Sequence, residues 1–138
     1  MWIVYALLAA FFAAMVPILA RIGIEGVNSN LAVAIRTAVV LVMAWLIVFL
    51  QGKQRDIRRI DRRSWLFIGF SGLATGLSWL FFYSALQDGP AGVVVPIDKL
   101  SIVVTVAFGY FVLREGLKKK PAFGLLLIVI GTISLLFI

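Results

Sequence analysis

The sequence predicts an all-α integral membrane protein with five transmembrane helices. Of its 138 residues, 63% are hydrophobic and 14% are charged, whereas soluble domains carry about 45–50% apolar and ~25% charged residues. The apolar residues form long continuous runs, and a transmembrane helix needs ~20 of them because the hydrocarbon core is ~30 Å thick. Strands of a membrane barrel alternate over ~10 residues instead. The runs therefore favour helices, whose backbone groups are bonded internally.

Five apolar runs divide the chain, and we treat residues 1–138 as a single transmembrane domain in a lipid bilayer. The first run is longer than the apolar core of a signal peptide, so we expect it to be retained. The polar stretch between the second and third runs has room for a short surface helix. The expected helices cover approximately residues 2–22, 31–50, 65–86, 91–113 and 122–138.

Basic residues gather in two loops on the same side of the membrane. Of thirteen Lys and Arg residues, six lie in the loop at 51–64 and four in the loop at 114–121. Because basic loops tend to stay in the cytoplasm, we expect a multi-pass protein of the bacterial inner membrane with a cytoplasmic N-terminus and an outward C-terminus. These charges lie in loops without a binding fold, so nucleic acid is not an expected partner.

The residue types present argue against several kinds of chemistry. The chain has no Cys and no His, which removes thiol chemistry, disulfides and Cys or His metal sites. Asp98 is the one acid well inside an expected helix, so paired carboxylates for acid–base catalysis are missing. We therefore expect no enzyme, no catalytic residue, no metal and no cofactor.

Charged residues inside the expected helices are the candidates for function, because each costs a few kcal/mol near the bilayer centre. Arg36 lies in the second helix, Asp98 and Lys99 lie in the fourth, and Arg21 closes the first. At ~1.5 Å per residue, Arg36 lies roughly 8 Å and Asp98 roughly 10 Å from the outer end of its helix. We expect these charges to share one layer in the outward half.

Two interpretations of this layer stay open. In one, the charges line a binding cavity, where Lys99 or Arg36 contacts an anionic group and Asp98 binds a cation or a proton. In the other, Arg36 and Asp98 form an ion pair that joins two helices, and Lys99 extends toward the surface. Asp98 and Lys99 are adjacent, so on a helix their side chains should diverge by ~100°.

Two prolines lie inside the expected helices, where each removes a backbone hydrogen bond. Helix breaks in transporters often lie beside binding sites, so Pro96, next to Asp98 and Lys99, is a candidate site residue. Pro17 is expected to cause only a kink, because proline is common in membrane helices. After the fourth helix, Glu115 is expected to pair with a nearby lysine, Lys118 or Lys119.

The third helix carries aromatic and small residues with different expected uses. Trp79 and Tyr83 are four residues apart and share a face. They belong either to an interfacial aromatic belt or to a surface that stacks on an aromatic or cationic substrate. The small residues let helix backbones approach closely, and helix packing is assigned to Gly69, Gly72 and Gly76.

Several short motifs follow one another along the whole chain. They are the Trp-led first helix with Pro17, Arg36, Phe82-Tyr83-Ser84-Ala85-Leu86, Gly89-Pro90-Ala91, Val95-Pro96-Ile97, Leu113-Arg114-Glu115, Gly124 and Gly131. Their order resembles the EamA-type modules of the drug/metabolite transporter superfamily. That family has ten helices in two five-helix repeats of opposite orientation, so this chain is similar to one half. Long members are often apolar at the positions of Asp98 and Lys99, and the charges here are similar to those of short, single-repeat members.

Together with the five spans and the buried charges, the resemblance implies a secondary transporter, or half of one. It would move a small metabolite or amphiphile across the inner membrane, in the export direction. Because the site in such folds lies between repeats, it also implies a dimer, either an antiparallel homodimer or a pair with an inverted paralogue. The basic loops oppose the antiparallel homodimer. A non-transporting scaffold or accessory subunit and a component of a lipid-linked-sugar flippase remain alternatives.

Overall fold

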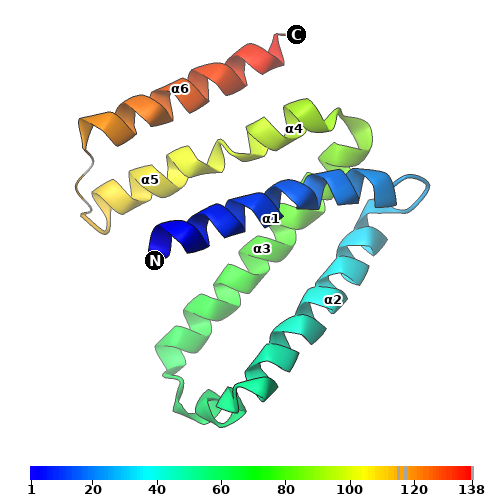
Figure 1. The fold of residues 1–138 in the computed structure, drawn as a ribbon, viewed down its shortest axis with the longest axis vertical. Coiled ribbons are helices and arrows are strands. Elements are labelled where there is room, and N and C mark those ends of the chain that lie inside the picture. The colour runs from blue at the N-terminus through cyan, green and yellow to red at the C-terminus, as the bar shows by residue number, and fades with distance from the viewer. Residues whose placement is uncertain (115, 117, 138) are drawn as a thin grey trace. The chain divides into compact units, whose positions relative to one another are not determined.

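The computed structural model describes residues 1–114, 116 and 118–137, which form helices and no strand (Figure 1). The chain divides into two compact units, Met1–Asp88 and Gly89–Ile138, and each is described by itself. The first unit holds α1 (Trp2–Gly23), α2 (Ser29–Leu50), the short 3₁₀-helix η1 (Lys53–Arg59) and α3 (Arg62–Asp88). The second unit holds α4 (Ala91–Asp98), α5 (Ser101–Phe111) and α6 (Lys119–Leu136).

Five stretches of the described residues are long and apolar enough to cross a membrane: α1, α2, α3, α4 together with α5, and α6. The 22 residues of α1 correspond to ~33 Å of helix, enough for the hydrocarbon core. Large apolar side chains along these helices face outward, and Trp2 is 76% and Leu50 79% exposed. Soluble proteins rarely expose apolar area on this scale. The predicted all-α membrane fold is confirmed.

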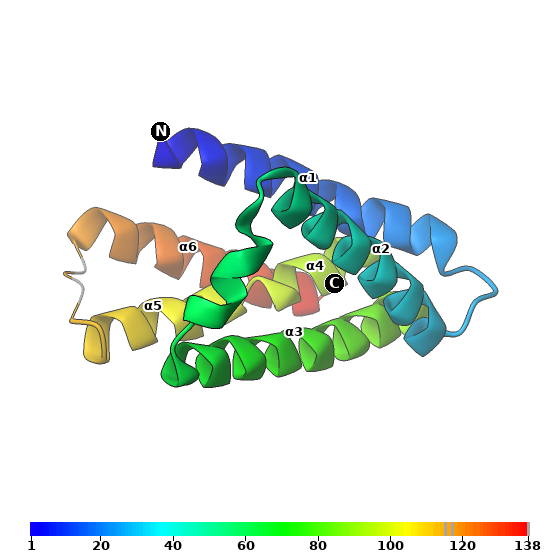
Figure 2. The ribbon, with the colours of Figure 1, turned by 90° about the horizontal axis from the view of Figure 1, so that it is seen from below.

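In the first unit, α2 and α3 run in opposite directions and η1 joins them at one end (Figure 2). Asn28 begins α2, because its side-chain oxygen accepts hydrogen bonds from the backbone N–H groups of Asn30 and Leu31. Gly52 follows α2 with φ of 68°, a left-handed conformation that glycine adopts without steric cost. The loop at 51–64 thus contains the short helix for which the sequence left room.

In the second unit, α6 runs back along α4 and α5 and packs against both (Figure 1). The sequence predicted one helix over residues 91–113, but the chain leaves the α-helix after Asp98 and re-enters it at Ser101. Pro96 has no N–H to donate to the carbonyl one turn earlier. Tight turns follow, in which Leu100 N bonds to Ile97 O at 3.0 Å and Ile102 N bonds to Lys99 O at 3.1 Å. The missing donor weakens the helix before Pro96, and the α-helix gives way to tight turns shortly after it.

The remaining helices differ from the expected ranges at their ends. α3 is 27 residues long, because Arg62, Arg63, Gln87 and Asp88 continue the helix beyond its apolar part. At ~40 Å it exceeds the hydrocarbon core, so its polar ends reach the membrane interfaces. α6 begins at Lys119 rather than at residue 122. Glu115 and its expected lysine pairing lie outside the described residues.

Candidate functional site

Three helix ends of the first unit meet around the turn that follows α1 (Figure 1). Arg21, in the last turn of α1, donates hydrogen bonds from Nη1 to the carbonyls of Leu86 and Gln87 at the end of α3. Gln87 in turn donates from Nε2 to the carbonyl of Val27 at 2.9 Å. A cation at a helix C-terminus also suits the helix dipole. Arg21, which the sequence placed in the charged layer, therefore fastens α1 to α3.

A second polar contact joins α2 to α3 at the same end. The hydroxyls of Ser29 and Ser84 lie 3.3 Å apart, and Ser84 also donates to the carbonyl of Leu80 at 2.9 Å. Beneath them lies the apolar core of this unit, where Ile24, Val33 and Tyr83 are buried. Ser29 and Gln87 were not among the site residues predicted from the sequence, although a polar residue next to an apolar helix end is a signal for such contacts.

A cavity of about 390 Å³ lies between α1, the following turn, α2 and α3. Its walls are apolar residues, Leu19, Ile24 and Ile35 among them, apart from Arg36 and Tyr83. A volume of this size lies within the ~300–1,000 Å³ typical of small-molecule sites. The cavity is therefore large enough for a small ligand with an apolar body, and it offers one cationic group.

Arg36 lies on the indole ring of Trp79, with its guanidinium carbon 3.5 Å from the ring centroid. Trp79 is held in an aromatic cluster by Phe82 and Tyr83, whose ring centroids lie 5.3 Å and 5.7 Å away in edge-to-face geometry. Such a cation–π contact contributes ~0.5–2 kcal/mol. Within Met1–Asp88, the described residues provide no salt bridge and no hydrogen-bond acceptor for the Arg36 side chain. Arg36 is thus held by a neutral ring and not by a counterion of its unit.

This cationic group lies well inside a membrane-spanning stretch. Arg36 is seven residues into α2, which starts at Ser29, so it lies roughly 10 Å from the start of that helix. Trp79 lies nine residues before the end of α3 at Asp88, or roughly 13 Å. A charge at this depth is costly, which is why intramembrane charges mark functional sites more often than surface ones do.

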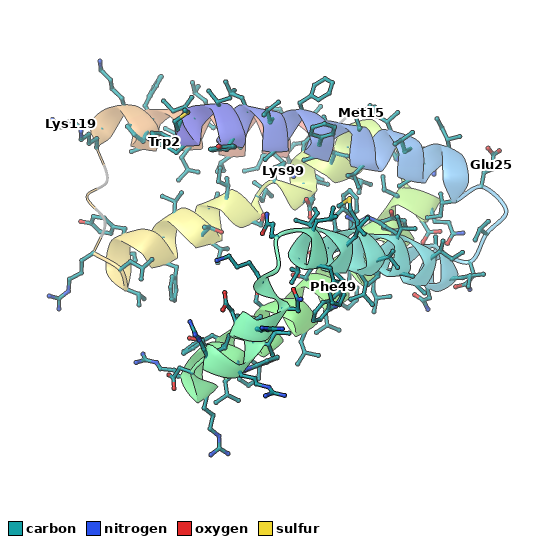
Figure 3. The ribbon with its side chains drawn as sticks, turned by 60° about the horizontal axis from the view of Figure 1, so that its bottom comes forward. Trp2, Met15, Glu25, Phe49, Lys99 and Lys119 are labelled. Carbon is teal, nitrogen blue, oxygen red and sulfur yellow. The ribbon has the colours of Figure 1, made fainter. Side chains whose placement is uncertain are left out.

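In the second unit, Pro96 and Asp98 lie in the last turn of α4, and Lys99 follows at the break between α4 and α5. Figure 3 labels Lys99 at this break. Lys99 Nζ lies 3.6 Å from Asp98 Oδ2. The expectation that these two side chains diverge was wrong, because the α-helix ends at Asp98 and the long lysine side chain bends back. A cavity of about 630 Å³ lies beside the break, lined by Pro96, Lys99 and residues of α6 that include Thr132.

The candidate residues thus form two groups, each within one unit. Arg36 and Tyr83 line the first cavity, and Trp79 lies behind Arg36 without lining it. Pro96, Asp98 and Lys99 lie at the helix break. The alternative ion pair between Arg36 and Asp98 would join residues of different units and stays a prediction. Gly69, Gly72 and Gly76 face open space within their unit, where nothing lies within 4 Å of an added Cβ. Their role in helix packing also stays a prediction.

Ionisable residues inside membrane-spanning helices, such as Arg36, mark substrate or ion pathways in membrane transport proteins. The chain belongs to the EamA-like transporter family, which matches residues 1–137. The resemblance seen in the sequence motifs is therefore confirmed, and membership indicates a membrane transporter rather than an enzyme.

Two relatives match the chain over nearly its whole length. A protein of Sinorhizobium sp., named an uncharacterized transporter in the 3′ region of cobO, is 42% identical over 134 residues, which cover 97% of this chain and 95% of the relative. An uncharacterized protein of Methanocaldococcus jannaschii is 30% identical over 133 residues, which cover 96% and 94%. Both relatives are thus about as long as this chain. No solved structure shows a significant match.

Proposed function

We propose that the chain is a subunit of a secondary transporter that exports a small metabolite or amphiphile across the bacterial inner membrane. The observation that carries the proposal is an intramembrane cation, Arg36, stacked on Trp79 at the wall of an apolar cavity. A purely structural arginine at this depth would be expected to bond to carbonyls or carboxylates, as Arg21 does. Arg36 has neither within its unit, so its donors are available to a substrate.

We propose that Pro96, Asp98 and Lys99 couple the binding of an ion to transport. Asp98 and Lys99 neutralise one another at 3.6 Å, beside a helix break of the kind at which transporters bind coupling ions. Binding of a cation or a proton at Asp98 would release Lys99 and change the charge beside the α4–α5 break. In this account Arg36, Trp79 and Tyr83 contact substrate, and Pro96, Asp98 and Lys99 respond to the ion.

The functional unit is proposed to be a dimer. Five spans correspond to one repeat of a fold in which the pathway lies between two inverted repeats, and both relatives are of single-repeat length. A homodimer or a pair with an inverted paralogue supplies the second wall. The basic loops at 51–64 and 114–121 favour one orientation, with the N-terminus in the cytoplasm.

An efflux assay tests the proposal on many candidate substrates at once. Proteoliposomes are loaded with a small-molecule extract of bacterial cells, and released compounds are identified by mass spectrometry. We expect the wild type to release a limited set of compounds that liposomes without protein retain, and Arg36→Gln to lose this release. Arg63→Gln is the matched control. Arg63 also lies over an aromatic ring, with its guanidinium carbon 5.8 Å from the ring centroid of Phe67, but it does not line the cavity. Equal release by the wild type and Arg36→Gln would reject the proposal.

A further inference from the structure

We propose that the cavity at Arg36 selects an anionic amphiphile, a molecule with one carboxylate, phosphate or sulfonate group on an apolar body. This inference rests on the proposed function and names the chemical class of its substrate. The sequence alone left open a cationic or aromatic substrate that stacks on Trp79. In the structure one face of that ring is covered by the guanidinium of Arg36.

The charge of the cavity lining favours an anion. Arg36 is the charged residue among those that line the cavity, and the other lining residues are apolar except for Tyr83. A cation placed in the cavity would meet an uncompensated positive charge in a low-dielectric environment, where repulsion is stronger than in water. An anion would supply the counterion that the unit itself does not provide.

The position of the Arg36 guanidinium on Trp79 also favours an anion. One face of the planar guanidinium rests on the indole of Trp79, which leaves the N–H groups along its edges as donors. Those donors match the paired oxygens of carboxylate, phosphate and sulfonate groups. Because Phe82 and Tyr83 pack against Trp79, the stacked position is held before a ligand arrives, and less ordering is required on binding.

The other cavity shows the contrast. Lys99 borders it, but this cation already has a carboxylate partner in Asp98 at 3.6 Å. An anion there would have to displace Asp98 from Lys99. Between the two cationic sites, the one at Arg36 is therefore the anion site, and its apolar walls accommodate the apolar body of the ligand.

Matched naphthalene probes test the charge preference directly. We would measure binding of 2-naphthalenesulfonate, 2-naphthalenemethanol and 2-naphthyltrimethylammonium by equilibrium dialysis, with the protein in phosphatidylcholine nanodiscs. A charge-assisted hydrogen bond predicts that the sulfonate binds at least about tenfold more tightly than the alcohol. The ammonium probe should bind most weakly. Binding of the ammonium probe as tight as that of the sulfonate would overturn the inference.

Two variants and one control assign the preference to Arg36. Arg36→Gln should bind the sulfonate and the alcohol equally, and unchanged binding of the alcohol shows that the cavity is intact. Arg36→Lys should keep a reduced preference for the anion, because it keeps the charge without the planar stack. Arg63→Gln should behave as the wild type. A full sulfonate preference in Arg36→Gln would reject Arg36 as the anion-binding group.

The anion has two possible sources, a soluble amphiphile or a lipid headgroup. Nanodiscs with added phosphatidylglycerol separate them: competition with the sulfonate assigns the site to lipid, and its absence assigns it to a soluble ligand. Failure of this inference is distinguishable from failure of the proposed function. If efflux depends on Arg36 but the binding shows no preference for the anion, the proposed transport is supported and the proposed substrate class is rejected. Anion-selective binding without any efflux rejects transport and keeps the site.

Discussion

Arg21 and Arg36 are arginines of the same three-helix bundle with different surroundings. Arg21 donates to two backbone carbonyls at the end of α3, whereas Arg36 lies on an aromatic ring at the wall of a cavity. The sequence predicted both in one charged layer in the outward half of the membrane, with Arg21 at the end of the first helix and Arg36 inside the second. It did not reveal their partners, because these come from a helix that is distant in sequence and are set by how α1, α2 and α3 pack.

Replacement of Arg21 tests whether its hydrogen bonds to α3 stabilise the packing of α1 against α3. Arg21→Gln removes the charge that holds the last carbonyls of α3, so we expect the free energy of unfolding in detergent to fall by about 1–2 kcal/mol. Arg55→Gln, on η1, is the control and should change the stability little, because exposed charges contribute little. An Arg21→Gln protein as stable as the wild type would mean that this contact does not hold the helices together.

At the scale of elements, the helix break after Pro96 is the feature that separates α4 from α5. From the sequence, Pro96 was predicted to remove a backbone hydrogen bond inside the fourth helix. Its neighbours Asp98 and Lys99 made this position a candidate site. The extent of the break depends on the residues after the proline, where turns at Leu100 and Ile102 replace α-helical bonds. By contrast, α1 continues unbroken past Pro17, so a proline alone does not determine where a helix ends.

Replacement of the two prolines by alanine should separate a functional break from a tolerated kink. Pro96→Ala restores a backbone donor, and alanine is favoured over proline in a helix interior by ~3 kcal/mol. We expect higher thermal stability but slower efflux, because the α4–α5 break is straightened. Pro17→Ala should leave efflux unchanged. If Pro96→Ala transported as fast as the wild type, the break would have no part in transport.

At the level of the whole molecule, the number of spans follows from composition. The apolar runs predicted five crossings because membrane thickness sets their length, and five spanning stretches are found in the described residues. The residues that line each cavity were not predictable in this way, because the lining depends on how the helices pack. Orientation in the membrane is a further prediction that rests on the loops.

Single-cysteine labelling tests that orientation, since the chain has no native cysteine. Asn30, near the start of α2, and Ser64, near the start of α3, are exposed, and neither substitution changes the charge. In intact cells, a membrane-impermeant thiol reagent should label Asn30→Cys and not Ser64→Cys. That result favours a partner of inverted topology. Comparable labelling of both variants would contradict a fixed orientation and favour an antiparallel homodimer.

We propose that the charge of Arg36 determines what this protein carries, and reversal of that charge is the sharpest test. Uptake of 2-naphthalenesulfonate and 2-naphthyltrimethylammonium into proteoliposomes would be compared for the wild type and Arg36→Glu. We expect the wild type to take up the sulfonate faster than the ammonium probe. In Arg36→Glu, sulfonate flux should fall at least about tenfold and ammonium flux should exceed it. Undiminished sulfonate flux in Arg36→Glu would mean that the charge of Arg36 does not select the substrate.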